Sequence, residues 1–319
     1  MSVPPPAQGV RLDWTALPAQ VRAAVEGWLG ETVVAAATQA GGFSPGVAAR
    51  LRTQSGRRVF VKAVGPEPNP DSAGMHRREA IIAAALPATA PVSRLLWSYD
   101  EGEGGWVALV FEDIEGRQPH QPWQADELDL VIDALDALAM ALTPSPIPEK
   151  IAGQLADTGL FRRAWWASVL PEPPPSLDPW SKRHLPLLAE LESQAAAAAY
   201  GETLLQVDLR ADNLLISEGR VIVVDWPHAR IGAAWIDPLF MAPSVAMQGG
   251  PDPATFFARL PACRAADPLA VTSVVALMAG FFTTLALQPP PPGLPTLRAF
   301  QDAQGRTARQ WLAERLGLP

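Results

Sequence analysis

Apolar and polar residues alternate in short runs through the first third of the chain, which is the pattern of half-buried β-strands. Glycine-containing turns separate these runs, and residues 100–104 (DEGEG) predict a hairpin between the last two. We therefore expect an antiparallel sheet of five strands. The strands are predicted at residues 33–37, 47–52, 59–64, 95–99 and 106–112.

A different period, with apolar residues three or four positions apart, predicts helices before and after these strands. Residues 13–29 carry apolar side chains at such spacings, and residues 71–86 predict a helix between the third and fourth strands. The remaining helices fall in the second part of the chain, at residues 125–142, 183–199, 255–265 and 297–316. The pattern indicates an α+β protein with two lobes. An N-terminal lobe (residues 1–116) holds the antiparallel sheet and a helix, and a mainly helical lobe (residues 117–319) follows.

One uncharged stretch, residues 268–288, is about as long as a membrane span. Gly280 and several Ser and Thr residues interrupt it, so we expect a buried core helix and no membrane partner. The N-terminus lacks the basic and apolar regions of a secretory signal. A single cysteine, Cys263, suits a reducing compartment. The expected localisation is cytoplasmic.

The net charge of −8 is carried mostly by the residues after 120. Nucleic-acid binding needs a basic surface, so this acidity argues against such a partner. It is compatible with a cationic substrate, although a solvated acidic surface explains it equally well. The sequence indicates nothing about the oligomeric state.

The most informative segment is 204–226 (LLQVDLRADNLLISEGRVIVVDW). Asp208 is followed five positions later by Asn213, and a predicted hairpin then leads to Asp225. Phosphoryl transfer needs a carboxylate beside the attacking hydroxyl and oxygen ligands for Mg²⁺ around the phosphates. In kinases these residues occur in the order of a D-x-x-x-x-N motif, two short strands and a second Asp, and Asp208, Asn213 and Asp225 follow the same order.

The complementary half of such a site lies upstream. Residues 40–47 (AGGFSPGV) form a glycine-rich turn around Ser44, and glycines let backbone N–H groups approach phosphates. Lys62 lies in the third strand, where kinases place the Lys that contacts the α- and β-phosphates. Its expected ion-pair partner is Glu79, the only Glu of the helix at residues 71–86.

With these segments, the chain resembles the aminoglycoside phosphotransferase family, the small-molecule branch of the protein-kinase-like fold. The resemblance runs from about residue 40 to residue 240, and Asp-Trp at 225–226 stands where protein kinases have D-F-G. It implies ATP or GTP as phosphate donor, Mg²⁺ as cofactor and a hydroxyl group of a small molecule as acceptor. The acceptor class stays open between an aminoglycoside or other antibiotic, a sugar and an amino alcohol, because a fold does not fix its substrate.

The resemblance also implies roles at the catalytic end. Asp208 would orient and deprotonate the acceptor hydroxyl, while Asn213 and Asp225 would hold Mg²⁺. Lys62 would hold the α- and β-phosphates with support from Glu79. Ser44 and the N–H groups around it would cover the phosphates.

At the other end, the segment that crosses between the lobes is expected to bind the nucleobase through its backbone. The carbonyl of Glu112 and the N–H of Ile114 are the expected contacts, and their side chains would carry no base specificity. Phe111 either lines the back of the base slot or simply packs in the core.

Two positions depart from the family pattern. Gln206 stands where the family usually has His, and we expect its amide to replace the hydrogen bonds of the imidazole. Arg210 stands where the family often has His; it either contacts the transferring phosphate or forms a structural salt bridge, to Asp212 or elsewhere. The substitution at Gln206 leaves a non-catalytic nucleotide-binding module as the alternative function. Asp237 is expected to brace the catalytic region.

Overall fold

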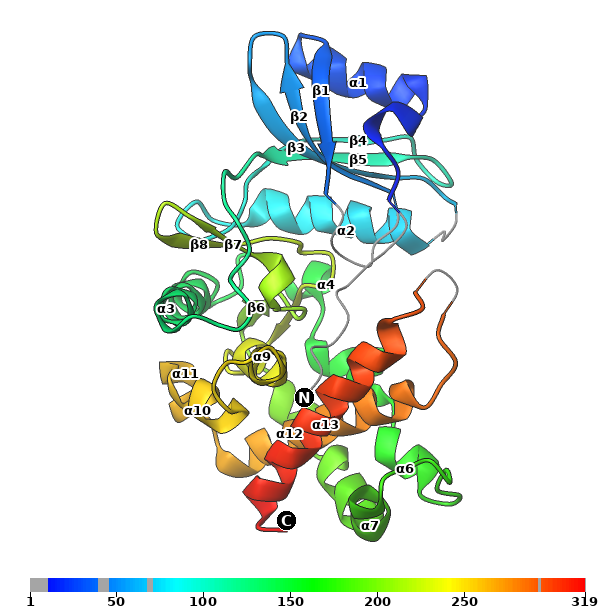
Figure 1. Ribbon diagram of the computed structural model, residues 1–319, viewed down its shortest axis with the longest axis vertical. Helices are drawn as coiled ribbons and strands as arrows, with labels where there is room; N and C mark the ends of the chain where they lie inside the picture. Colours follow the sequence, from blue (N-terminus) through cyan, green and yellow to red (C-terminus); the bar gives the residue numbers. More distant parts are fainter. Residues whose placement is uncertain (1–10, 40–45, 68–70, 292–293, 319) are drawn as a thin grey trace. The chain divides into compact units, whose positions relative to one another are not determined.

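The computed structural model describes residues 11–39, 46–67, 71–291 and 294–318 (Figure 1). Internal contacts divide the chain into two compact units. We call them the sheet unit (residues 6–118 and 212–228) and the helical unit (residues 1–5, 119–211 and 229–319).

The sheet unit is built on five antiparallel strands in the order β1-β2-β3-β5-β4, as predicted. Register pairs Lys62 of β3 with Ala48 and Leu109 on its two neighbours, and Phe60 with Arg50 and Phe111. Because side chains alternate across a strand, Arg50, Phe60 and Lys62 lie on one face of the sheet. The strands are β1 Val33–Thr38, β2 Val47–Thr53, β3 Arg58–Val64, β4 Leu95–Asp100 and β5 Val107–Glu112.

A helix packs on each face of this sheet (Figure 1). Helix α1 (Ala19–Leu29) buries Val21 and Val25 against the small and β-branched residues of β2 and β3. Helix α2 (Asp71–Ala85) packs Ala73 and Ala83 in a second cluster with residues of β5. The predicted helix at residues 13–29 begins as a 3₁₀ turn, η1 (Trp14–Ala16), because Pro18 separates that turn from α1.

A hairpin of β7 (Leu214–Ser217) and β8 (Arg220–Val223) completes the sheet unit. Arg117 and Ile216 exchange two backbone hydrogen bonds of 3.1 and 2.7 Å, and the Val223 N–H donates to the Pro91 carbonyl at 2.8 Å. The sequence-based division placed residues 212–228 with the helical lobe. These hydrogen bonds are why the segment instead packs with residues 6–118.

The helical unit contains the long helices α3, α7, α9, α12 and α13. Two predicted helices are each split in the structure. Residues 183–199 divide at Gln194, and residues 255–265 divide before Pro261, which has no N–H to donate and disfavours a helical residue in front of it. The long helices are α3 Ala125–Ala141, α7 Pro179–Ser193, α9 Ile236–Met247, α12 Pro268–Ala286 and α13 Leu297–Leu316.

Shorter elements connect these helices. Strands β6 (Thr203–Leu205) and β9 (Arg230–Gly232) pair antiparallel and flank the segment that carries Asp208. The others are α4 Glu149–Ala152, η2 Leu155–Asp157, α5 Gly159–Arg162, α6 Trp165–Val169, α8 Ala195–Ala199, η3 Ala211–Asn213, α10 Pro253–Ala258 and α11 Pro261–Arg264. Of these, η3 is shared between the two units, because the division falls after Ala211.

Helix α12 is the one helix within the described residues that is long and apolar enough to cross a membrane. In its most apolar stretch, 67% of the residues are buried inside the structure. It packs against α13, α7 and α8, as the core helix of a folded unit does.

Candidate active site

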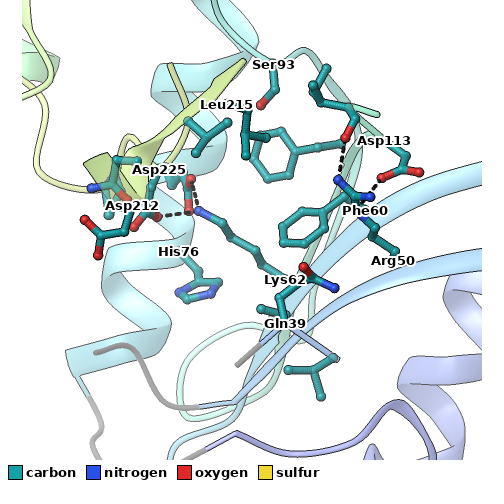
Figure 2. A pocket seen from close by; sticks show the side chains of 18 of the residues that line it. Gln39, Arg50, Phe60, Lys62, His76, Ser93, Asp113, Asp212, Leu215 and Asp225 are labelled. Atoms are coloured by element: carbon teal, nitrogen blue, oxygen red, sulfur yellow. Dashed lines mark hydrogen bonds and ion pairs between the residues drawn. The ribbon is translucent and has the colours of Figure 1, made fainter. Parts of the chain in front are cut away.

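The sheet unit contains a cavity of about 420 Å³ (Figure 2). Its walls come from β2, β3, α2, the end of β5 and the β7–β8 hairpin. One end carries charged side chains and the other end is mainly apolar. This is the division that a nucleotide, with its phosphates and its base, would require.

Lys62 lies between two carboxylates at the charged end of the cavity. Its Nζ is 2.6 Å from Glu79 Oε1 and also contacts Asp225 Oδ1. The ion pair predicted between Lys62 and Glu79 is therefore confirmed. Burial alone would lower the pKa of Lys62, but the two carboxylates outweigh it and raise that pKa, so the ammonium group stays charged.

The two carboxylates respond differently to this shared cation. Burial raises the pKa of Glu79 despite the opposing effect of Lys62. Burial acts in the same direction on Asp225, but Lys62 outweighs it and lowers the pKa of that carboxylate. Asp225 is thus ionised and about one third of its side chain is exposed, so it can accept a further cation.

Asp225 follows β8 in a left-handed conformation with a φ of 68°. The next residue, Trp226, is buried, and its backbone N–H donates to Glu79 Oε1 at 3.2 Å. Glu79 therefore holds both the Lys62 ammonium and the backbone beside Asp225. A non-glycine residue at positive φ is uncommon, and this carboxylate contact fixes the turn that directs Asp225 toward Lys62.

Asn213 ends the 3₁₀ turn η3 and lines the same cavity as Asp225. The Val224 N–H donates to the Asn213 carbonyl at 3.0 Å, which ties the two ends of the hairpin together. Among the described residues, no group of three or more His, Cys, Asp or Glu side chains could hold a metal. An amide oxygen and a carboxylate do fit Mg²⁺, because this ion usually takes one or two protein ligands and completes its shell with phosphate oxygens and water.

Phe60, Phe111 and Leu215 line the apolar end of the cavity, where residues 112–114 form one edge. The Glu112 side chain points to Arg94, with its Oε2 2.9 Å from the guanidinium. Ser44, the predicted phosphate-covering residue, lies outside the described residues.

Sequence reasoning missed Arg50, whose guanidinium reaches this edge. Its NH2 group donates to the Ile114 carbonyl at 2.5 Å, and its Nε is 3.1 Å from Asp113 Oδ1. Arg58 bonds the other oxygen of the same carboxylate at 2.6 Å. No local pattern signals this cluster, because Arg50 and Ile114 are 64 residues apart in the sequence.

Arg11 and His76 also line the cavity and were not predicted. The backbone at Arg11 forms a β-bridge with Gly46, and the Leu12 N–H donates to the Gly46 carbonyl at 3.0 Å. This pairing places Arg11 at the cavity. His76 lies one helical turn before Glu79, with its Nδ1 3.0 Å from the Ser72 carbonyl, so Nδ1 carries the proton. Burial, and then the charge of Lys62, lower the pKa of His76 to about 4. The sequence could have indicated His76, because a residue three positions before Glu79 lies on the same face of a helix.

In the helical unit, the segment before Asp208 is held by Asp237 of α9. The Asp237 carboxylate accepts the N–H groups of Gln206 and Val207 at 2.7 and 2.8 Å. Val207 has a φ of 75°, an unfavourable conformation for a β-branched residue. Gln206 is fully buried, and its Oε1 accepts the Asp208 N–H at 2.7 Å. Gln206 thus supplies a hydrogen bond within the loop, as expected of an amide in place of an imidazole.

Arg210 lies beside Asp208, with its NH1 3.4 Å from Asp208 Oδ1. The guanidinium stacks over the Phe300 ring with its carbon 5.5 Å from the ring centre. Arg210 therefore forms a salt bridge to Asp208 within the helical unit.

Comparison with known proteins decides which family the chain belongs to. Residues 39–270, most of the chain, match the model of the Phosphotransferase enzyme family (APH). The chain belongs to this family. It is a small-molecule kinase, a phosphotransferase with an alcohol group as acceptor. No curated protein sequence matches it.

Several solved structures have a fold similar to that of this phosphotransferase, although few residues are identical. Choline kinase LicA from Streptococcus pneumoniae gives a TM-score of 0.60 at 14% identity, and the match covers 92% of this chain and 98% of that one. A thermostable mutant of aminoglycoside phosphotransferase APH(4)-Ia, in a ternary complex with ADP and hygromycin B, gives 0.58 at 15% identity, covering 93% and 98%. A choline/ethanolamine kinase family protein from Mesorhizobium loti gives 0.55 at 16% identity, covering 85% and 86%. At these identities, the likeness confirms the protein-kinase-like fold.

Proposed function

We propose that this phosphotransferase moves the γ-phosphate of a purine nucleoside triphosphate, ATP or GTP, to a hydroxyl group of a small molecule. The observation that carries the proposal is Lys62 between Glu79 and Asp225 at one end of a cavity whose other end is mainly apolar. Phosphates need a fixed cation at one end, and a purine needs an apolar slot with a polar edge at the other.

Each residue at the charged end has a distinct role in the proposal. Lys62 binds the α- and β-phosphates, and Glu79 keeps its ammonium group in place. Asn213 and Asp225 hold Mg²⁺, which when bound neutralises charge on the phosphates. Ser44 and the neighbouring N–H groups cover the phosphates.

Asp208 acts on the acceptor. Its carboxylate accepts a hydrogen bond from the acceptor hydroxyl, orients it and takes its proton as the new P–O bond forms. Arg210 neutralises charge on the transferring group, for which a planar guanidinium is suited. The loop hydrogen bonds from Asp237 and Gln206 position the Asp208 backbone for this role.

The acceptor we propose is an aminoglycoside-like antibiotic, a sugar or an amino alcohol, and a cationic one fits best. The similar structures include a choline kinase and an enzyme in complex with hygromycin B. The net charge of −8 favours attraction of a cation. With an antibiotic as acceptor, the enzyme would confer resistance, and its place would be the cytoplasm, where ATP and GTP are found.

The first experiment measures thermal unfolding with and without Mg²⁺ and ATP or GTP. A ligand that binds only the folded state raises its stability, so the midpoint should rise when metal and nucleotide are added together. Asp225→Ala should remove most of this rise. Glu218→Ala is the matched control, because Glu218 is an exposed carboxylate in the turn of the same hairpin. An unchanged response in Asp225→Ala would show that Asp225 is not a metal ligand.

The acceptor is then sought by release of ADP or GDP from a panel of hydroxylated compounds. The panel should contain choline, ethanolamine, hygromycin B, spectinomycin and neutral sugars. Turnover with a cationic compound and none with neutral sugars is the expected result. Turnover with neutral sugars alone would contradict the charge argument.

A further inference from the structure

Arg50 brings a fixed positive charge to the edge of the base slot. It extends from β2 on the face that also carries Phe60 and Lys62, and it lines the cavity (Figure 2). Asp113 holds the guanidinium at 3.1 Å, and Arg58 bonds the other oxygen of that carboxylate. Since the Asp113 side chain is only 2% exposed, this arrangement keeps Arg50 in one position.

The contact that matters is between Arg50 and the Ile114 carbonyl, at 2.5 Å. The same oxygen accepts the Gly116 N–H at 3.0 Å. A carbonyl oxygen has two lone pairs, so these two donors saturate it. The backbone at residue 114 therefore offers a nucleobase no acceptor at this oxygen.

This saturation distinguishes the two purines, given the proposed base contacts at residues 112 and 114. Adenine donates from its 6-amino group and accepts at N1, which matches the Glu112 carbonyl and the Ile114 N–H. Guanine has the opposite pattern, since O6 accepts and N1–H donates. In the position of adenine, guanine would set acceptor against acceptor and donor against donor.

Guanine could avoid this mismatch only by moving one position along the edge. Its O6 would then accept the Ile114 N–H, and its N1–H would need the Ile114 carbonyl. Arg50 and Gly116 occupy that carbonyl, and the guanidinium would also face the 2-amino donor of guanine. Both placements leave polar groups unpaired, which is costly in a partly buried slot.

We propose that Arg50 selects adenine over guanine nucleotides by occupying the Ile114 carbonyl, so that ATP is the phosphate donor. The proposal rests on the proposed function, because it assumes that the base lies against residues 112–114. Arg50 acts here as a specificity-determining residue, and removal of its donors opens the acceptor that guanine needs.

The test compares the dissociation constants of Mg·ATP and Mg·GTP by calorimetry. The wild-type protein should bind GTP about tenfold to a hundredfold more weakly than ATP, the range expected for unpaired buried donors and acceptors. Arg50→Met keeps the methylene stem without donors and should reduce this ratio at least about fivefold, mainly through tighter GTP binding. Arg50→Ala is the second variant, in case Met fills the slot.

Arg58→Ala is the matched control. Arg58 shares the Asp113 carboxylate with Arg50 but does not line the cavity, so its loss should leave the ratio unchanged. Equal wild-type affinity for the two nucleotides, tighter binding of GTP, or an unchanged ratio in both folded Arg50 variants would overturn the inference alone. Failure of the wild-type protein to bind either nucleotide would overturn the proposed function, and this inference with it.

Discussion

In each unit of this phosphotransferase, one carboxylate of the candidate site lies at or next to a residue with a positive φ. A second, buried carboxylate accepts backbone N–H groups there and holds that conformation. In the sheet unit, Asp225 itself has the positive φ, and Glu79 accepts the next N–H. In the helical unit, Val207 has the positive φ just before Asp208, and Asp237 accepts two N–H groups. The same local solution thus occurs twice, on unrelated elements.

The two supporting carboxylates differ in what balances their charge. Glu79 has the Lys62 ammonium at 2.6 Å, whereas the Asp237 carboxylate accepts the N–H groups of residues 206 and 207. Burial raises the pKa of Asp237 to about 6, and the nearby charge of Asp208 adds to this effect. The sheet unit thus balances its supporting carboxylate with a side-chain cation, while the helical unit surrounds Asp237 with backbone N–H groups and adds the Gln206 side chain to hold the loop.

The largest expected effect is on turnover, from Asp208→Asn. This variant keeps the shape of the side chain but loses the base, so turnover should fall roughly 10²- to 10⁴-fold. Nucleotide affinity should stay nearly constant, because Asp208 acts on the acceptor. Steady-state kinetics with the acceptor found in the panel, together with calorimetry for the nucleotide, would measure both. A loss of less than tenfold in turnover would contradict the role of Asp208.

A smaller effect, on nucleotide binding, is expected from the Lys62–Glu79 pair. Lys62→Ala should weaken binding and catalysis together, and Glu79→Ala should do so more mildly because Glu79 acts through Lys62. The double variant should resemble Lys62→Ala, since residues that act as a unit are not additive. The affinity of all three for Mg·ATP is the measurement.

Glu79→Gln separates the two contacts of this carboxylate. It keeps an oxygen for the Trp226 N–H but removes the charge that faces Lys62. We expect its affinity to lie between those of the wild-type protein and Glu79→Ala. Additive losses in the double variant would show instead that Lys62 and Glu79 act independently.

The smallest expected effect is a pH-dependent change in stability from Asp237→Asn. The folded-state pKa of about 6 lies above the usual 3.8, so the folded protein binds an additional proton between these values. Stability from this group is therefore present at low pH and is lost as the pH rises toward 6. The Asn variant has no carboxyl group to titrate, so its stability does not fall in this way. The unfolding midpoint of the wild-type protein minus that of the variant should therefore be larger at pH 4.5 than at pH 6.5. An advantage that stays constant across this range would show that Asp237 does not titrate there.

Sequence patterns predicted the sheet unit well because its information is local. Period-two alternation located five strands to within one or two residues, and the order of the motifs predicted the Lys62–Glu79 pair. Arg50 was not predicted, because its contact with Ile114 depends on the register that places β2, β3 and β5 side by side. A sequence does not reveal which of several strand arginines reaches a given carbonyl.

Residues 149–169 were not predicted for a related reason. They form four short helical segments without a sustained period, and their ends depend on distant side chains. Helix α6, for example, begins where the Glu192 carboxylate of α7 accepts the N–H groups of Trp165 and Trp166 at 2.8 and 2.9 Å. That contact spans 27 residues, beyond the reach of any capping rule based on neighbouring positions.

The position of the β7–β8 hairpin also affects how the protein is made. The sheet unit uses residues 6–118 and then residues 212–228, so ribosomal synthesis must pass through 93 residues of the helical unit before the cavity is complete. Until Asp225 emerges, the nascent chain has Lys62 with only one of its two carboxylates and has Arg117 without its hairpin partner. A shortened protein that ends at residue 118 would therefore lack the part of the cavity wall that comes from the β7–β8 hairpin and Asp225.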